Sequence, residues 1–512
     1  MKAGDVLVID LFAGPGGLGE GVSSVTDEVG EHPFKIGISV EKEPSAHKTL
    51  TTRAFYRKIK DLDGGLDSYF RYVRNEITRE DIFNLYPEQA QEALVETLEA
   101  PRALGEDNEL IHSRIRQLVT NHNGPKIVIG GPPCQAYSLA GRSRNAGNKA
   151  YRAENDQRNF LYKEYLKVLA IAQPDIFVME NVRGILSAKI NGKVIFPQIL
   201  QDLRNPGLAV GLSHVSKYKV FSLVVEAKDP ANPDYPDSTD FLIRSEKYGI
   251  PQARHRVILL GVRSDINCVP QTIPSAPKMV TVAQVLSDLP PLRSGFSKQK
   301  DIQKVWESQV KLNSKQLKRI LKKKFDTEAV NCLDIEPLIG LKRKSRDLIE
   351  VEHNFPPHLV RWYLDNSPNC VLNHESRGHM ASDLLRYAYS AAFTQLSGGI
   401  SPKAKDFPKE LAPEHENWNS GSHADRFRTQ SANKYATTVT SHISKDGHYF
   451  IHYDPKQCRS LTVREAARLQ TFPDNYLFEG NRTQQYVQVG NAVPPYLAKQ
   501  IGEVVIEILK QL

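Results

Sequence analysis

The feature that most constrains this chain is the stretch of residues 127–134, in which a short apolar run is followed directly by two glycines and two prolines. Residues 127–129 are β-branched and predict a short buried strand. The two glycines that follow end the strand and allow the backbone to approach a ligand closely. Pro132 and Pro133 then stiffen the chain, because proline fixes its own φ and restricts the residue before it. Cys134 is therefore predicted to lie on a rigid turn just past a strand end.

A lone cysteine is more often an inert buried side chain than a nucleophile. The position of Cys134 favours a site, because ligands bind at the carboxyl edge of open α/β sheets. The chain has five cysteines, scattered and without a C-x-x-C pair, so neither a disulfide framework nor a zinc site is expected and a reducing cytoplasm fits. No apolar run is long enough to span a bilayer, so we expect no membrane partner. The scattered cysteines give no reason to expect a metal partner.

A second ligand-binding pattern lies near the N-terminus. The predicted strand of residues 6–11 runs into a G-x-G-x-x-G pattern over residues 14–19. A second predicted strand, residues 36–40, ends in Glu41, at the spacing where a carboxylate binds ribose hydroxyls. This spacing fits any adenosine-bearing cofactor, nicotinamide or other, and a Gly-rich structural turn is the simpler alternative.

Two further stretches bring charged side chains toward the same edge. The predicted strand of residues 175–179 ends in Glu180, one helix and one strand after the cysteine. A later strand, residues 257–262, would begin at the carboxyl edge if it hairpins back antiparallel. Arg254 and Arg256 would then join Glu180, although an Arg-x-Arg pair serves equally well as a surface ion-pair element.

Positive charge is concentrated in one part of the chain. The 512 residues carry a net charge of +8. Residues 298–346 hold 14 Lys and Arg against 6 Asp and Glu, which is a candidate footprint for nucleic acid or an ordinary solvated face. The polar stretch 138–159, with several arginines, predicts either a solvated loop or a mobile loop that closes over a phosphate backbone.

Six stretches, taken in order, resemble the DNA cytosine-5 methyltransferase family of bacterial modification enzymes. They are Asp10–Gly14, Pro133-Cys134-Gln135, Glu180-Asn181-Val182, Gln252–Arg256, Arg459–Asp474 and Gln488–Pro495. The resemblance implies an α/β fold, namely a Rossmann-like S-adenosylmethionine-dependent methyltransferase sheet with an antiparallel last strand. It also implies a smaller inserted target-recognition domain. We expect residues 1–292 to form the first part of the catalytic domain, 293–457 the recognition domain and 458–512 a returning segment.

The resemblance also implies roles for single residues. Cys134 is the expected nucleophile, with Glu180, Arg254 and Arg256 as the other catalytic residues. The residues expected to bind S-adenosylmethionine are Phe12, Gly14, Gly16, Gly17, Leu18, Glu41, Pro132, Asn491, Ala492 and Val493. The residues expected to contact DNA are Gln135, Ser138, Arg142, Lys322, Lys323 and Lys324. The family's acidic adenine-binding residue has several candidates in 53–124, Asp107 among them.

The expected function is methyl transfer from S-adenosylmethionine to C5 of a flipped-out cytosine in a specific duplex DNA sequence, through a covalent Cys134 adduct. The expected setting is a bacterial cytoplasm with its nucleoid, where the enzyme modifies host DNA, alone or with a cognate restriction or defence complex. A tRNA cytosine-5 methyltransferase of the same fold would keep every catalytic motif. A non-catalytic DNA-binding relative would have lost the cysteine or the glutamate, and both are present. A nicotinamide dehydrogenase would explain the Gly-rich loop but none of the later motifs.

Overall fold

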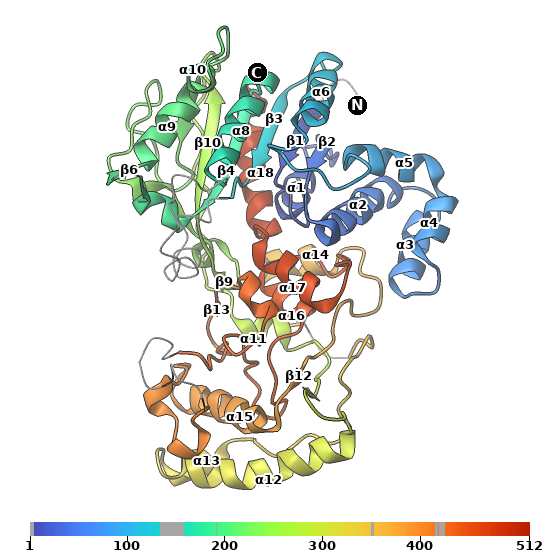
Figure 1. Ribbon diagram of the computed structural model, residues 1–512, viewed down its shortest axis with the longest axis vertical. Coiled ribbons are helices and arrows are strands. Elements are labelled where there is room, and N and C mark those ends of the chain that lie inside the picture. The colour runs from blue at the N-terminus through green and yellow to red at the C-terminus, as the bar shows by residue number, and fades with distance from the viewer. Residues whose placement is uncertain are drawn as a thin grey trace. The chain divides into compact units, whose positions relative to one another are not determined.

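The computed structural model describes residues 5–133, 158–190, 192–349, 353–414, 418 and 425–511. The chain divides into two compact units. The first unit consists of residues 1–248, 254–276 and 492–512, and the second consists of residues 249–253 and 277–491. Each unit is described separately below (Figure 1).

The first unit alternates strands and helices along its described residues. Its strands are β1 (Val6–Leu11), β2 (Phe34–Val40), β3 (Lys126–Gly130), β4 (Ile176–Val182), β5 (Lys189–Ile190), β6 (Lys193–Val194), β7 (Tyr218–Phe221), β8 (Leu242–Arg244) and β10 (His255–Arg263). Its α-helices are α1 (Gly17–Ser23), α2 (Pro44–Ile59), α3 (Gly65–Val73), α4 (Arg79–Leu85), α5 (Pro87–Glu96), α6 (Asn108–Thr120), α8 (Arg158–Ala172), α9 (Phe196–Arg204), α10 (Pro206–Val210) and α18 (Pro495–Leu509). Short 3-10 helices are η2 (Arg183–Ser187), η3 (Ser238–Phe241) and η4 (Ser245–Tyr248).

Seven strands form the sheet in the order β2-β1-β3-β4-β10-β7, with β8 also paired to β10. The first four strands are parallel, so their carboxyl ends share one edge. Strand β10 runs antiparallel to β4 and therefore begins at that edge, where Arg256 pairs with Val182. The predicted α/β sheet with an antiparallel strand is confirmed. Strand β7 is short and ends at Phe221.

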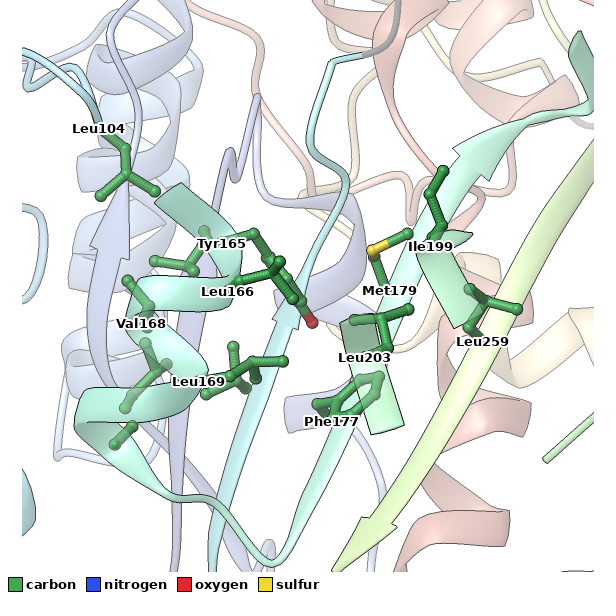
Figure 2. Packing of buried hydrophobic residues seen from close by; sticks show 14 of the residues in the cluster. Leu104, Tyr165, Leu166, Val168, Leu169, Phe177, Met179, Ile199, Leu203 and Leu259 are labelled. Atoms are coloured by element: carbon green, nitrogen blue, oxygen red, sulfur yellow. The ribbon is translucent and has the colours of Figure 1, made fainter. Parts of the chain in front are cut away.

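One face of the sheet is covered by α6, α8 and α9, which bury a continuous apolar core. Side chains of β4 and β10 that point to this face, such as Phe177, Met179 and Leu259, pack against Leu169 of α8 and Leu203 of α9 (Figure 2). All five are at most 1% exposed. This packing holds β4 and β10 side by side, which the charged residues at their ends require.

Two helices pack tightly against each other through glycines, α1 and the C-terminal α18. A Cβ placed on Gly21 of α1 would lie 2.1 Å from the Pro495 carbonyl oxygen. A Cβ on Gly502 of α18 would lie 2.8 Å from Val25. No larger residue fits at Gly21 without displacing backbone, so these glycines set how closely the returning segment approaches the first helix.

The regular secondary structure of the second unit is mainly helical, with only two-residue strands among its described residues. Its elements are β9 (Gln252–Ala253), α11 (Val282–Leu286), β11 (Gly295–Phe296), α12 (Gln303–Leu321), α13 (Thr327–Cys332), α14 (Pro357–Leu364), β12 (Gly378–His379), α15 (Ala381–Leu396), η5 (Ala404–Asp406), η6 (Lys409–Leu411), β13 (Ala436–Thr437), η8 (Ser441–Ser444), α16 (Val463–Leu469) and α17 (Arg482–Asn491). Helices α12 and α15 share an apolar core in which Trp306 is fully buried.

In other parts of the second unit, buried arginines hold segments of the chain together through hydrogen bonds and ion pairs. Arg464 is fully buried and donates to the carbonyl oxygens of Leu372, Pro473 and Tyr476 at 2.9, 3.0 and 2.6 Å. Arg459 pairs with the Glu465 carboxylate at 2.6 Å. A guanidinium has five N–H donors, so one side chain can satisfy several loop carbonyls that no strand partner reaches.

Helix α16 begins with a capping box at Thr462. Thr462 caps α16, accepting a hydrogen bond from the Glu465 amide, while the Glu465 side chain accepts from the Thr462 amide. In the described parts of the chain every helix is too short or too polar to cross a bilayer.

We predict that stability falls as the pH drops from 6.5 to 4, in part through His374. Its Nδ1 lies 2.9 Å from the Thr462 hydroxyl and its Nε2 lies 2.8 Å from the Pro290 carbonyl, which suits a neutral ring that accepts at Nδ1 and donates at Nε2. Burial lowers the pKa of His374 to about 4. In this pH window the unfolded chain binds a proton that the folded one does not, so His374 costs about 2 kcal/mol at pH 5.

The measurement is urea unfolding at pH 7 and pH 5 for the wild type, for His374→Gln and for His442→Gln, an exposed histidine of the same unit. His374→Gln is expected to shrink the difference between the two pH values, and His442→Gln is expected to leave it unchanged. An undiminished difference in His374→Gln would contradict this account.

Candidate active site

The loop after β1 is held in a left-handed conformation beside Glu41. Phe12, Gly14 and Gly16 have φ values of 54°, 58° and 97°, and only for Phe12 is such a value costly. The Gly14 amide donates to Glu41 Oε2 at 2.8 Å, and the Glu43 amide donates to Oε1 at 2.7 Å. Burial raises the pKa of the Glu41 carboxyl. The structure thus joins the Gly-rich loop to the acidic residue, as the spacing predicted.

The returning segment closes onto the same loop. A Cβ on Gly17 would lie 2.4 Å from the Val493 carbonyl oxygen and 3.4 Å from the Ala492 Cβ. Leu18, Ala492 and Val493 are buried. Asn491 is exposed at the end of α17. The Gly17 position therefore has no room for a side chain, and this close contact brings residues 492–493 to the expected cofactor loop.

Asp10 is a buried acid at this site that the sequence analysis did not assign a role. It is fully buried on β1, and neither carboxylate oxygen has a hydrogen-bond partner among the described residues. Its Oδ2 faces α1, 2.8 Å from where a Cβ of Gly19 would stand, and it pairs in register with the buried Ser39. An orphaned carboxylate under a Gly-rich loop fits a cationic ligand, and S-adenosylmethionine carries both a sulfonium and an ammonium.

The adenine-binding acid remains without an assigned residue, but Asp107 has a structural role. Its Oδ2 accepts from the Ala103 amide at 2.7 Å and its Oδ1 lies 3.5 Å from Arg102. The Arg102 amide donates to the Glu41 carbonyl at 2.9 Å. Asp107 thus closes a turn that lies against Glu41, which brings this turn, rather than the Asp107 carboxylate, to the cofactor loop.

Glu180 and Arg256 form the second half of the site. Arg256 Nε lies 2.7 Å from Glu180 Oε1, and both side chains are largely buried. A Cβ on Gly131 would lie 2.7 Å from Glu180 Oε2, so the glycine leaves room for the carboxylate. Burial lowers the pKa of Arg256, and the Glu180 charge opposes that effect. Glu180 and Arg256 thus meet at the carboxyl edge of the sheet, as predicted.

Neighbouring backbone contacts fix this half of the site. The Asn181 side-chain amide donates to the Pro132 carbonyl at 3.2 Å, which ties the glycine-proline turn to the end of β4. The Arg254 amide donates to Ser245 Oγ at 3.0 Å, and Ser245 Oγ donates to the Arg254 carbonyl at 2.7 Å. These two hydrogen bonds fix the backbone of Arg254. Burial, and then the nearby Arg256, lower the pKa of Arg254. Arg254 is thus a buried support behind Arg256.

Four predicted residues lie outside the described part of the chain: Cys134, Gln135, Ser138 and Arg142. The described chain stops at Pro133, one residue before the expected nucleophile. Among the described residues, no group of three or more His, Cys, Asp or Glu is arranged to hold a metal ion.

The Gln-x-Arg-x-Arg motif divides between the two units. Arg254 and Arg256 belong to the first unit, whereas Gln252 belongs to the second. Gln252 is buried, donates to the Leu469 carbonyl at 3.0 Å and accepts from the Val439 amide at 2.7 Å. Its role is structural, which the motif alone did not reveal.

The three lysines predicted to contact phosphate differ in their surroundings. Lys322 and Lys323 are exposed beyond the end of α12. Lys324 donates to the Asp406 carbonyl at 2.8 Å and lies 5.0 Å from the centre of the Phe393 ring. Lys324 is therefore occupied within the unit, and Lys322 and Lys323 are the better placed for a partner.

Residues 373–379 contain a group of structural side chains that no sequence motif indicates. Arg377 donates to the carbonyls of Ile443 and Lys445 at 2.6 and 2.9 Å and lies 4.5 Å from the centre of the Tyr486 ring. Asn373 exchanges hydrogen bonds with the Phe478 backbone. In the sequence, these residues are marked only by a cluster of Asn, His and Arg in a stretch that lacks the periodicity of a helix or a strand.

We predict that Asp10→Asn stabilises the cofactor-free protein by an amount that grows between pH 4 and pH 8. Burial raises the pKa of Asp10 to about 8. In this window the unfolded chain has lost the proton that the folded chain keeps, so stability falls by up to about 1.4 kcal/mol per pH unit, and asparagine removes that dependence.

The measurement is thermal unfolding at several pH values, with Ser39→Ala as a matched change on the paired strand. A stabilisation by Asp10→Asn that is the same at pH 5 and pH 8 would contradict a raised pKa.

Comparison with known proteins identifies the family. Residues 88–507 match the model of the C-5 cytosine-specific DNA methylases. The chain is 33% identical to the type II methyltransferase M.Bpa9945I of Bacillus paralicheniformis, over 98% of this chain and 99% of that protein. It is 26% identical to the type II methyltransferase M1.HphI of Haemophilus parahaemolyticus, over 98% of this chain and 86% of that protein.

A solved structure agrees with the fold. A protein described as a DNA modification methyltransferase encoded within an E. coli prophage superposes with a TM-score of 0.52, at 18% identity, covering 99% of this chain and all of that one. The family draws its methyl group from S-adenosylmethionine, and the buried Asp10 carboxylate, which has no hydrogen-bond partner among the described residues, fits that cofactor. This chain therefore belongs to the C-5 cytosine-specific DNA methylase family, and it is a DNA (cytosine-5) methyltransferase that uses S-adenosylmethionine.

Proposed function

We propose that this chain is the modification enzyme of a type II restriction–modification or phage-defence system, methylating one cytosine in a specific duplex sequence. The family match and the relatives named as type II methyltransferases support the setting. The observation that carries the chemistry is the Glu180–Arg256 pair at the carboxyl edge, 2.7 Å apart. It lies beside the turn that leads to Cys134, because Asn181 binds the Pro132 carbonyl.

The proposed reaction begins with a covalent bond from the Cys134 sulfur to C6 of cytosine. C5 is a poor nucleophile, and addition of a thiolate at C6 makes it enamine-like. Glu180, protonated for this step, would donate to N3 and accept from the exocyclic amine, stabilising the charge that the addition pushes into the ring. Arg256, supported by Arg254, would hold the O2 side of the base.

S-adenosylmethionine supplies an electrophilic methyl group when it is bound. The residues proposed to hold it are Phe12 against adenine, Glu41 at the ribose and the loop of residues 491–493. After C5 has gained the methyl group, a base removes the C5 proton. The electrons of that C–H bond then expel the Cys134 thiolate and restore the enzyme.

The target base has to leave the DNA stack to reach this site, which costs a few kcal/mol. Polar and basic side chains that hold the phosphate backbone would offset that cost. Gln135, Ser138 and Arg142 are proposed to do so next to the nucleophile, and Lys322 and Lys323 in the second unit.

We predict that Cys134→Ala abolishes methyl transfer to duplex DNA while DNA binding persists. A second variant, Glu180→Gln, is expected to lower turnover by about 10²-fold or more, because it loses a group that stabilises developing charge. The measurement is transfer of a tritiated methyl group, with Cys332→Ala as the control because Cys332 is an exposed cysteine of the second unit. Residual turnover in Cys134→Ala would show that another residue is the nucleophile.

The substrate class is tested in the same assay. Duplex DNA is expected to accept the methyl group and bulk tRNA is not. Bisulfite sequencing of DNA from cells that express the protein would then locate the methylated site. Transfer to tRNA alone would replace the proposed function with tRNA methylation.

We further propose that residues 293–457 read the target sequence, since every catalytic motif lies outside them. Phosphate contacts position a protein on DNA, whereas contacts to base edges specify the sequence. A region that holds the second unit's exposed basic helix and many polar side chains suits both tasks.

We predict that exchanging residues 353–457 for the matching region of a relative changes which cytosine is methylated. The chimaera keeps Asn373, His374 and Arg377, because their contacts tie this region to the rest of the second unit. Bisulfite sequencing reads the outcome. A folded, active chimaera that still methylates the original site would place specificity elsewhere.

A further inference from the structure

A hairpin of the catalytic unit follows directly from the strand that carries Glu180. Strand β4 ends at Val182, and η2 begins with Arg183. Strands β5 and β6 then pair antiparallel, Lys189 with Val194 and Ile190 with Lys193. Figure 1 shows β6 beside α9, in the same unit as β4 and β10. This hairpin therefore starts at the carboxyl edge of the sheet, where Arg256 also lies.

The charge of this segment has one sign. Residues 183–195 contain Arg183, Lys189 and Lys193 and no aspartate or glutamate. All three cations are exposed, and none has an ion-pair partner among the residues that the structure describes. The opposite edge of the sheet differs, because there Arg263 is paired with Asp175 and Asp265.

The hairpin is anchored to the core. Ile185 and Ala188 are buried, and Ile190 and Ile195 pack against the apolar cluster beneath α9. The Ile195 amide donates to the Ala188 carbonyl at 3.0 Å and closes the base of the hairpin. Gly192 has a φ of 79°, which suits a tight turn. The backbone that carries the lysines is therefore ordered, so less conformational entropy is lost when they bind a partner.

We propose that Arg183, Lys189 and Lys193 bind phosphates of duplex DNA on the catalytic unit, from the two faces of the hairpin that follows β4. This inference rests on the proposed function. Three cations without an ion-pair partner among the described residues suit a polyanion, and the segment that carries them follows directly from β4, the strand of Glu180. The surface positions the duplex and carries no sequence information, because phosphate contacts are the same at every sequence.

The test compares two variants of equal charge loss. Lys189→Gln/Lys193→Gln removes two cations from the hairpin. Lys35→Gln/Lys217→Gln removes two from the beginnings of β2 and β7, at the opposite edge of the sheet. The probes are a fluorescent duplex that carries the site located by bisulfite sequencing and a second duplex with that site scrambled. Binding is measured by anisotropy over a range of salt concentrations, and thermal unfolding checks that both variants are folded.

The hairpin variant is expected to bind both duplexes several-fold more weakly, to a similar extent. The slope of log K against log salt should fall by about 1.8, from about 0.9 for each lost phosphate contact. In methylation assays the loss is expected in KM for DNA. The control variant should keep the wild-type slope.

A hairpin variant with the wild-type slope and affinity would overturn the inference, and so would a loss confined to the duplex with the intact site. Failure of the proposed function is distinguishable, because the wild-type protein itself would then not methylate duplex DNA.

Discussion

The antiparallel register of β10 against β4 is the constraint on which the catalytic half of this protein depends. A parallel crossover would carry the start of β10 to the opposite edge of the sheet. Because β10 is antiparallel, Arg256 stands opposite Val182 and reaches Glu180. The apolar face of the same two strands, with Met179 and Leu259, holds that register in place. Core packing and the polar site are thus two consequences of one strand pairing.

Close approach of backbone to backbone has a similar role at the cofactor loop. Gly17 and Gly21 leave no room for a side chain, and the backbone of residues 493–495 fills that space. The first and last segments of the chain consequently build one site. The unpaired Asp10 beneath them is a cost in stability that a purely structural strand would not carry, and such costs gather at functional sites.

The second unit is organised by polar contacts to an unusual degree. Arg377, Arg464 and Arg468 each bind backbone carbonyls, those of Ile443 in η8, Tyr476 in a loop and Val285 in α11. A buried guanidinium so satisfied is compatible with irregular backbone, whereas an apolar side chain would leave those carbonyls without donors. Such a scaffold can hold fixed loops while the exposed residues between them vary.

The sequence by itself determined the class of fold, the main strands and the fact that several of them end at one edge of the sheet. It could do so because β-branched runs followed by glycine leave few alternatives to a strand end. It also predicted Glu41, Glu180 and Arg256 as site residues, because their motifs combine a strand end with a charged side chain, and the structure brings Glu180 and Arg256 together. Only the tertiary structure decided that Gln252 and Asp107 make structural hydrogen bonds and that Lys324 binds the Asp406 carbonyl. It also decided that the Asp10 carboxylate has no hydrogen-bond partner among the described residues. These properties depend on which distant groups come within hydrogen-bonding distance, and no local pattern of residues encodes that.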